Sequence, residues 1–220
     1  ADRPRPMKLL KEPLLHFLVL GALVVGLAGV AAFAVIEGRV AFPLLPLGLL
    51  RRRNFTAAML GSLFAGAAYM GGFVLAPLLL QSVFAYSVTT ASLFTLVRPA
   101  VFAVTSPLGG SAATRYGERS VAVFGTVAIA AALVALGVGT EEHLVALVLA
   151  ALALQGVGNG TSQPSLTATL ANAVEEHDLG VAAAAQRMMW QVGSALGITV
   201  MTSVYGGTEE ASDFLNAYVV

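Results

Sequence analysis

The chain has 220 residues, of which 57% are hydrophobic and 11% are charged, and its acidic and basic residues balance at zero net charge. Soluble domains carry about 25% charged residues, so this chain has too few charges to cover a water-exposed surface. Zero net charge provides no attraction to nucleic acid, and the lack of cysteine excludes disulfides and thiolate zinc sites. We expect the lipid bilayer, and no nucleic acid, to be its partner.

Apolar runs long enough to cross a bilayer recur along the chain. A helix rises about 1.5 Å per residue, so roughly 20 apolar residues span the hydrocarbon. Backbone groups in lipid must pair within their own segment, which favours helices, and the alternation typical of barrel strands is absent. Six runs have this length: 14–36, 55–83, 88–112, 120–138, 144–172 and 179–205. The predicted fold class is all-α, a polytopic membrane protein built as a helical bundle.

More polar segments separate these runs. Residues 1–13 are basic and are predicted to lie outside the membrane, before a first membrane helix at 14–36. Residues 37–54 contain four arginines and form a linker to a five-helix bundle over 55–205. The acidic tail, 206–220, ends in an apolar stretch that is too short to span.

The placement of lysine and arginine predicts the orientation of the bundle. Arginines occur in the 37–54 linker and in the 113–119 loop. The alternating loops, 82–87, 139–143 and 206–213, contain neither arginine nor lysine. We therefore expect both arginine-bearing segments in the cytoplasm, together with the acidic 173–178 loop. The basic 1–13 segment would then lie outside, which is understandable if the chain is a piece of a longer one whose upstream helices set the topology.

Small residues recur at helical spacing, as the pairs Gly61/Ala65, Gly156/Gly160 and Gly193/Gly197. Such positions let two helix backbones approach closely in a membrane. The pattern predicts a tightly packed bundle, and it is shared by transporters, channels and membrane enzymes.

Arg98 lies near the middle of the third run, beside Pro99. A charge at this depth costs about 3 kcal/mol on insertion scales, so it faces a cavity or a partner. Two interpretations follow: a cavity cation that contacts substrate, or a structural arginine bonded to neighbouring carbonyls. Pro99 removes a helical hydrogen bond, which predicts a disturbance of the helix there. Arg187, two turns into the sixth run, can snorkel to the interface and is expected to be structural.

The fifth run is rich in amides, hydroxyls and glycines between Gln155 and Pro164, and includes Asn159 and Gln163. These groups are costly in lipid, so they should face protein or water, either as a cavity lining or as interhelical contacts. Tyr69 and Gln81 of the second run are further candidates for a cavity wall or for packing.

Catalytic and metal-binding patterns are missing from the sequence. The three histidines have no metal-ligand spacing, and no metalloprotease, nucleophile-elbow or nucleotide-loop motif occurs. We therefore expect no enzyme, no metal site and no cofactor. No carboxylate lies within any of the six spans, so a proton-carrying residue, if one is used, lies elsewhere.

Several segments in order resemble a known family. They are the arginine-bearing linker 43–55, the stretch 73–81 followed by Tyr86-Ser87, the loop with Gly110, Arg115, Gly117 and Arg119, and the segments 156–164 and 187–197. In this order they resemble the major facilitator superfamily, and within it the 14-helix drug:proton antiporters of bacteria. The loop is similar to the second copy of the family's signature loop, in which Gly110 would permit tight packing and Gly117 a sharp turn. The family's aspartate is Thr114 here, which puts the conformational latch in doubt.

The resemblance implies the C-terminal half of a transporter. The missing N-terminal half would be its partner, and the 206–220 tail would begin a missing final helix. The second, third, fifth and sixth runs would face the central cavity or the cleft between the two halves, and the fourth would lie outside. Arg98, Gln155, Asn159 and Gln163 would then contact the cavity, beside the candidates Tyr69 and Gln81.

The implied activity is proton-coupled efflux of drug-like or amphipathic small molecules across the cell membrane, driven by the proton motive force. Two alternatives stay open. One is a facilitator of a specific polar solute with the same fold, and the other is an inactive transporter fragment.

Overall fold

The computed structural model describes residues 47–205 and seven positions of the first run, 24, 28, 29, 31, 32, 35 and 36, which are helical. The predictions for the 1–13 segment, for most of the 14–36 run, for the first part of the linker and for the 206–220 tail lie outside the described residues. The chain divides into two compact units, Ala1–Leu47 and Gly48–Val220. The second unit contains most of the described residues, including every position from 48 to 205.

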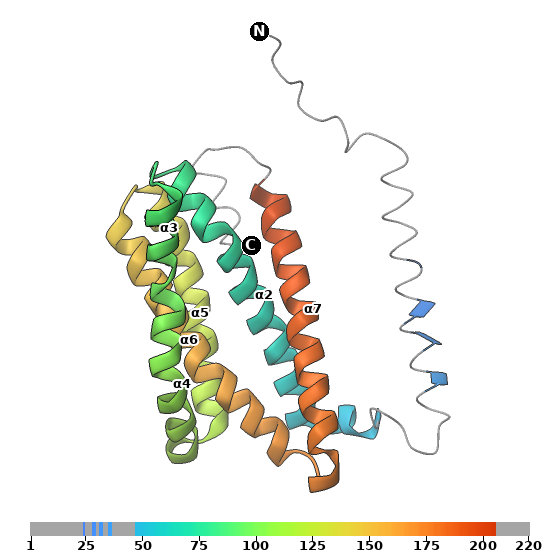
Figure 1. The fold of residues 1–220 in the computed structure, drawn as a ribbon. Helices are drawn as coiled ribbons and strands as arrows, with labels where there is room; N and C mark the ends of the chain where they lie inside the picture. The colour runs from blue at the N-terminus through green and yellow to red at the C-terminus, as the bar shows by residue number, and fades with distance from the viewer. Residues whose placement is uncertain (1–23, 25–27, 30, 33–34, 37–46, 206–220) are drawn as a thin grey trace. The chain divides into compact units, whose positions relative to one another are not determined.

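Each of the last five predicted runs contains a helix (Figure 1). The elements are η2 Leu47–Arg51, α2 Arg53–Ser82, α3 Val88–Thr95, α4 Val97–Tyr116, α5 Glu118–Glu141, α6 Val145–Asn172, η3 Glu176–Asp178 and α7 Leu179–Tyr205. Among the described residues, four spans are long and apolar enough to cross a membrane: α2, α3 with α4, α5 and α6. α7, with 27 residues, is also long enough to cross a membrane, but it is not among these four apolar spans. The predicted all-α membrane fold is confirmed.

The third run is interrupted where the sequence places a proline. Pro99 has no N–H to donate to the carbonyl four residues before it, and the helix breaks for one residue, Leu96, between α3 and α4. The Leu96 N–H donates to the carbonyls of both Ser92 and Leu93 at 3.2 Å, and Ala100 N–H resumes the ladder by donating to Leu96 at 3.1 Å. The predicted disturbance at Pro99 is therefore confirmed.

The predicted loop at 113–119 is wrong in its extent. α4 continues to Tyr116 and α5 begins at Glu118, so Gly117 alone separates them. Gly117 has φ 87°, in the left-handed region that glycine adopts without steric cost, and its N–H donates to the Ala113 carbonyl at 3.0 Å. The expected sharp turn at Gly117 is confirmed. Both helices extend past the apolar run because one glycine suffices to reverse the chain.

The two arginine-bearing segments lie at the same end of the bundle. Arg52 Nη1 donates to the carbonyl of Ala173, at the end of α6, at 2.8 Å. The Asn172 amide donates to the carboxylate of Glu118, at the start of α5. We call this end, where α2 and α5 begin and α6 ends, the basic end. The predicted shared side of the arginines is confirmed.

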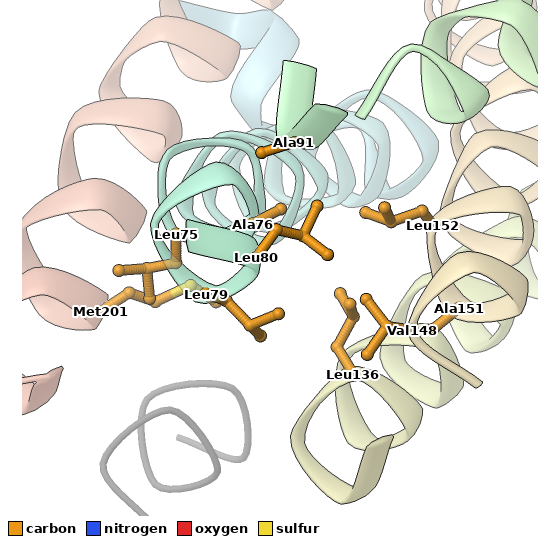
Figure 2. Close-up of a cluster of buried hydrophobic side chains, with 10 residues drawn as sticks. All are labelled: Leu75, Ala76, Leu79, Leu80, Ala91, Leu136, Val148, Ala151, Leu152 and Met201. Carbon is orange, nitrogen blue, oxygen red and sulfur yellow. The ribbon is translucent and has the colours of Figure 1, made fainter. Parts of the chain in front are cut away.

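Apolar packing closes the other end of the bundle. There the Phe84 ring lies 6.0 Å from the His143 ring, which joins the α2–α3 turn to the α5–α6 turn. Figure 2 shows the core cluster beside it, formed from α2, α3, α5, α6 and α7. Its members are Leu75, Ala76, Leu79, Leu80, Ala91, Leu136, Val148, Ala151, Leu152 and Met201. The outward faces carry exposed apolar side chains such as Phe64, Val104 and Val127, as expected of surfaces in contact with lipid.

Glycines let α2 and α7 lie side by side (Figure 1). A Cβ added at Gly193 would overlap the Leu63 carbonyl oxygen, and one added at Gly197 would overlap the Ala67 carbonyl oxygen. These obstacles are backbone atoms, which cannot move aside as a flexible side chain could. The predicted packing role of the Gly193/Gly197 pair is confirmed.

This contact yields a stability prediction. Gly193→Ala should lower the free energy of unfolding by about 1–3 kcal/mol, because the added methyl forces α2 and α7 apart. The control is Gly180→Ala near the start of α7, where an added Cβ meets nothing within 4 Å. Thermal unfolding of the detergent-solubilised protein measures both. Equal midpoints for the two variants would contradict the close approach.

Candidate functional site

Arg98 joins three helices inside the bundle. It lies on α4 and is 1% exposed. Its Nη1 donates to Gln155 Oε1 of α6 at 2.6 Å and to the Tyr69 carbonyl of α2 at 3.2 Å. Its guanidinium also stacks over two rings of α2, 4.3 Å from the Tyr69 centroid and 4.5 Å from the Phe73 centroid. We call these four side chains the Arg98 cluster.

Gln155 uses both ends of its amide in this cluster. Its Oε1 accepts from Arg98, and its Nε2 donates to the Ala68 carbonyl at 3.4 Å. The side chain is fully buried. Satisfied polar groups of this kind add specific contacts between helices in a low-dielectric interior. The geometry therefore favours the structural interpretation of Arg98.

A cavity of about 410 Å³ lies next to the cluster, between α2, α4, α6 and α7. It is lined by Tyr69, Phe102, Asn159, Gln163, Thr167, Ala183, Gln186, Arg187 and Trp190, and we call it the interhelical cavity. Its helices belong to the second, third, fifth and sixth predicted runs. α5, the fourth, supplies no residue to the lining of this cavity. The predicted division between inner and outer helices of a transporter stays a prediction.

The lining combines aromatic faces with amides. The rings of Tyr69 and Trp190 lie 5.9 Å apart on facing sides of α2 and α7. Thr167 and Gln186 bond to each other across α6 and α7, with distances of 3.2 and 3.1 Å. Asn159 is 4% exposed, and its Oδ1 is buried and accepts no hydrogen bond within the described part of the chain. A residue of the cavity lining therefore holds a buried acceptor without a donor in the described residues.

The sequence candidates separate into three groups. Tyr69, Asn159 and Gln163 line the interhelical cavity. Arg98 and Gln155 lie behind its wall and are not among the lining residues. Gln81 lies away from it, near the end of α2, where its Nε2 donates to the Pro77 carbonyl at 3.1 Å. Of the two interpretations of Gln81, cavity wall or packing, this backbone contact favours packing.

Several lining residues escaped the sequence predictions. Gln155, Asn159, Gln163 and Thr167 recur every four residues, which places them on one face of α6. This period would have identified Thr167. Trp190 had no comparable signal, because helix packing alone decides which face of α7 meets the cavity.

The signature-loop residues lie apart from this cavity. Gly117 and Arg119 line a second cavity of about 810 Å³ at the basic end, and Arg115 is exposed in the last turn of α4, with its guanidinium 5.4 Å from the Tyr116 ring centroid. The expected tight packing at Gly110 is not seen among the described residues, where a Cβ added there meets nothing within 4 Å. A Cβ added at its neighbour Gly109 would instead lie 2.6 Å from the Gly160 carbonyl oxygen, because one residue turns the helix face by about 100°.

Comparison with known proteins agrees with this arrangement. Residues 58–209 match the family described as the Major Facilitator Superfamily. The multidrug transporter protein MdtP of Bacillus subtilis is 24% identical over 188 residues, 84% of this chain and 34% of its own length. A tetracycline resistance determinant of Streptomyces rimosus is 31% identical over 182 residues, 81% of this chain and 52% of its own.

A third relative covers still more of this chain. The puromycin resistance protein pur8 of Streptomyces alboniger is 30% identical over 198 residues, 88% of this chain and 39% of its own length. The chain thus spans between about a third and a half of the length of these relatives.

Removing Arg98 should destabilise the bundle. Arg98→Ala leaves Gln155 Oε1 and the Tyr69 carbonyl without their donor, and we expect a loss of about 2–3 kcal/mol in the free energy of unfolding. Arg51→Ala, which removes an exposed arginine at the basic end, should cost less than about 0.5 kcal/mol. Denaturation of the detergent-solubilised variants gives both values. A similar stability for the two would show that Arg98 makes no structural contribution.

Proposed function

Because the chain belongs to the Major Facilitator Superfamily, we propose that it forms one helical bundle of an exporter of drug-like, amphipathic small molecules. It is a multi-pass protein of the cell membrane and a transport protein rather than an enzyme. The observation that carries the proposal is the interhelical cavity, which presents aromatic rings and amides between four membrane helices. Such surfaces bind the apolar body of a solute and orient its polar groups.

The relatives support the choice of export as the activity. Their names describe a multidrug transporter, a tetracycline resistance determinant and a puromycin resistance protein. Because this chain spans at most about half of each, we propose that sequence beyond it supplies a second bundle that completes the transport pathway. The two bundles would rock about the cavity to expose it to each side of the membrane in turn.

We further propose that the proton motive force drives export. Within α2 to α7, carboxylates lie only at the ends, as Glu118 and Glu141 of α5 do, and none lines the interhelical cavity. A proton carrier in the membrane interior normally requires a buried acidic group or histidine. We therefore place the carrier in the second bundle.

The experiment is a dye-efflux assay on cells that overexpress the gene containing this chain. We expect faster loss of a lipophilic fluorescent dye than in cells with the empty vector, and we expect an uncoupler to abolish the difference. The chain of 220 residues, reconstituted alone into vesicles, should show no counterflow. Unchanged dye retention on overexpression would refute the export proposal, and counterflow by the isolated chain would refute the need for a second bundle.

Within the cavity, Trp190→Ala should raise the KM for an exported aromatic dye by about tenfold, because aromatic stacking on such a ring contributes about 0.5–1.5 kcal/mol beyond buried area. Trp190→Phe keeps an aromatic face and should restore most of the affinity. Concentration-dependent initial efflux rates measure both. An alanine variant with an unaltered KM would exclude the ring from the binding surface.

A further inference from the structure

The interior of this bundle carries positive charge only. Counting α3 and α4 as one membrane span, the charged residues that lie away from the ends of the described spans α2 to α7 are Arg98 and Arg187. Arg98 is held behind the cavity wall, with its guanidinium 4.3 Å from the centroid of the Tyr69 ring that lines the cavity. Arg187 lines the cavity itself. Charges interact more strongly in a low-dielectric interior than in water, so this surface favours electron-rich ligands and repels cations.

Arg187 is placed to bind a ligand. It is exposed on α7, one turn before Trp190 and beside Gln186. In the described part of the chain, no carboxylate lies within ion-pair distance of it. Arg187, which was expected to be structural or interfacial, therefore also contributes to the cavity wall. A guanidinium presents a planar set of donors that matches an anionic oxygen.

The amide of Asn159 favours a ligand that also carries a hydrogen-bond donor. Its buried Oδ1 has no donor in the described part of the chain, and it lies on the stripe of α6 that faces the cavity. An unpaired buried acceptor costs about 1–3 kcal/mol, so a rotation of the Asn159 amide that brings Oδ1 to a ligand hydroxyl in the cavity is favoured. The rings of Tyr69 and Trp190 supply flat apolar faces for the body of the same ligand.

We propose that the interhelical cavity selects planar aromatic solutes with acidic hydroxyl groups, either phenols or enols, over lipophilic cations. An ionised oxygen accepts from Arg187, a neutral hydroxyl donates to Asn159 Oδ1, and the ring system packs against Tyr69 and Trp190. This inference rests on the proposed export function and names its substrate class.

The test compares the export of two dyes by cells that express the gene containing this chain. Fluorescein, loaded as its diacetate, carries phenolic oxygens on a planar xanthene ring beside a benzoate group, and ethidium is a cation with a planar ring system. The unmodified protein should export fluorescein in preference. Arg187→Gln should lower fluorescein export by about tenfold, the loss of one charge-assisted hydrogen bond, without lowering ethidium export. Arg187→Lys keeps the charge and should retain most of the export.

Two further variants make the result specific. Asn159→Asp places a carboxylate in the cavity and should shift the ratio of ethidium to fluorescein export upward by about tenfold or more. Arg51→Gln removes the same charge from an exposed position that is not part of the lining, and should leave the ratio unchanged.

The outcomes separate this inference from the function on which it rests. Export of ethidium but not fluorescein would overturn the substrate class and leave the export function standing. An equal fall in the export of both dyes by the Arg187→Gln variant would also overturn the substrate class, since that result would indicate a general defect in transport. Export of neither dye by the unmodified protein would refute the export function and the inference together.

Discussion

A guanidinium inside a membrane bundle must have its donors satisfied by protein, and this constraint organises the described helices. Arg98 meets it by bonding to Gln155 of α6 and to the backbone of α2, while its flat face covers the rings of Tyr69 and Phe73. One side chain thereby sets the distance between α2, α4 and α6. The same guanidinium packs on the Tyr69 ring and so holds it in place. The neighbour of that ring across the cavity is Trp190. The shape of the cavity wall thus follows from the burial of a charge.

The remaining packing makes one end of the bundle apolar and leaves polar side chains nearer the basic end. Leucines and alanines of the core cluster close the end opposite the arginines, whereas the face of α6 toward the basic end carries Asn159, Gln163 and Thr167 instead. α7 packs closely on α2 through Gly193 and Gly197 but makes few contacts with α6. The cavity occupies the space that this sparse contact leaves. A surface that is apolar at one end and polar in the middle is suited to a solute that must enter and leave again.

Much of this architecture was predictable from local physical chemistry. The length of the apolar runs predicted the helices, and the alternation of basic loops predicted that Arg52 and Arg119 share one end. The position of Pro99 predicted the break at Leu96. The loop before Glu118 was predicted too long, because hydropathy detects the bilayer boundary and not the hydrogen-bonded end of a helix. The acceptors of Arg98 were not predictable, since they lie 29 and 57 residues away and depend on how three helices rotate against each other.

The most direct test of this account is a measurement of which face of α6 meets the cavity. The chain contains no cysteine, so single cysteines at Gln163 and Ser165 can be labelled with a water-soluble maleimide in membranes. Gln163 lines the cavity, whereas Ser165 is fully buried. We predict rapid labelling at 163 and protection at 165, and a loss of this contrast when Arg98→Gln releases α6 from α2 and α4. Equal labelling of the two positions with Arg98 present would contradict the arrangement around Arg98.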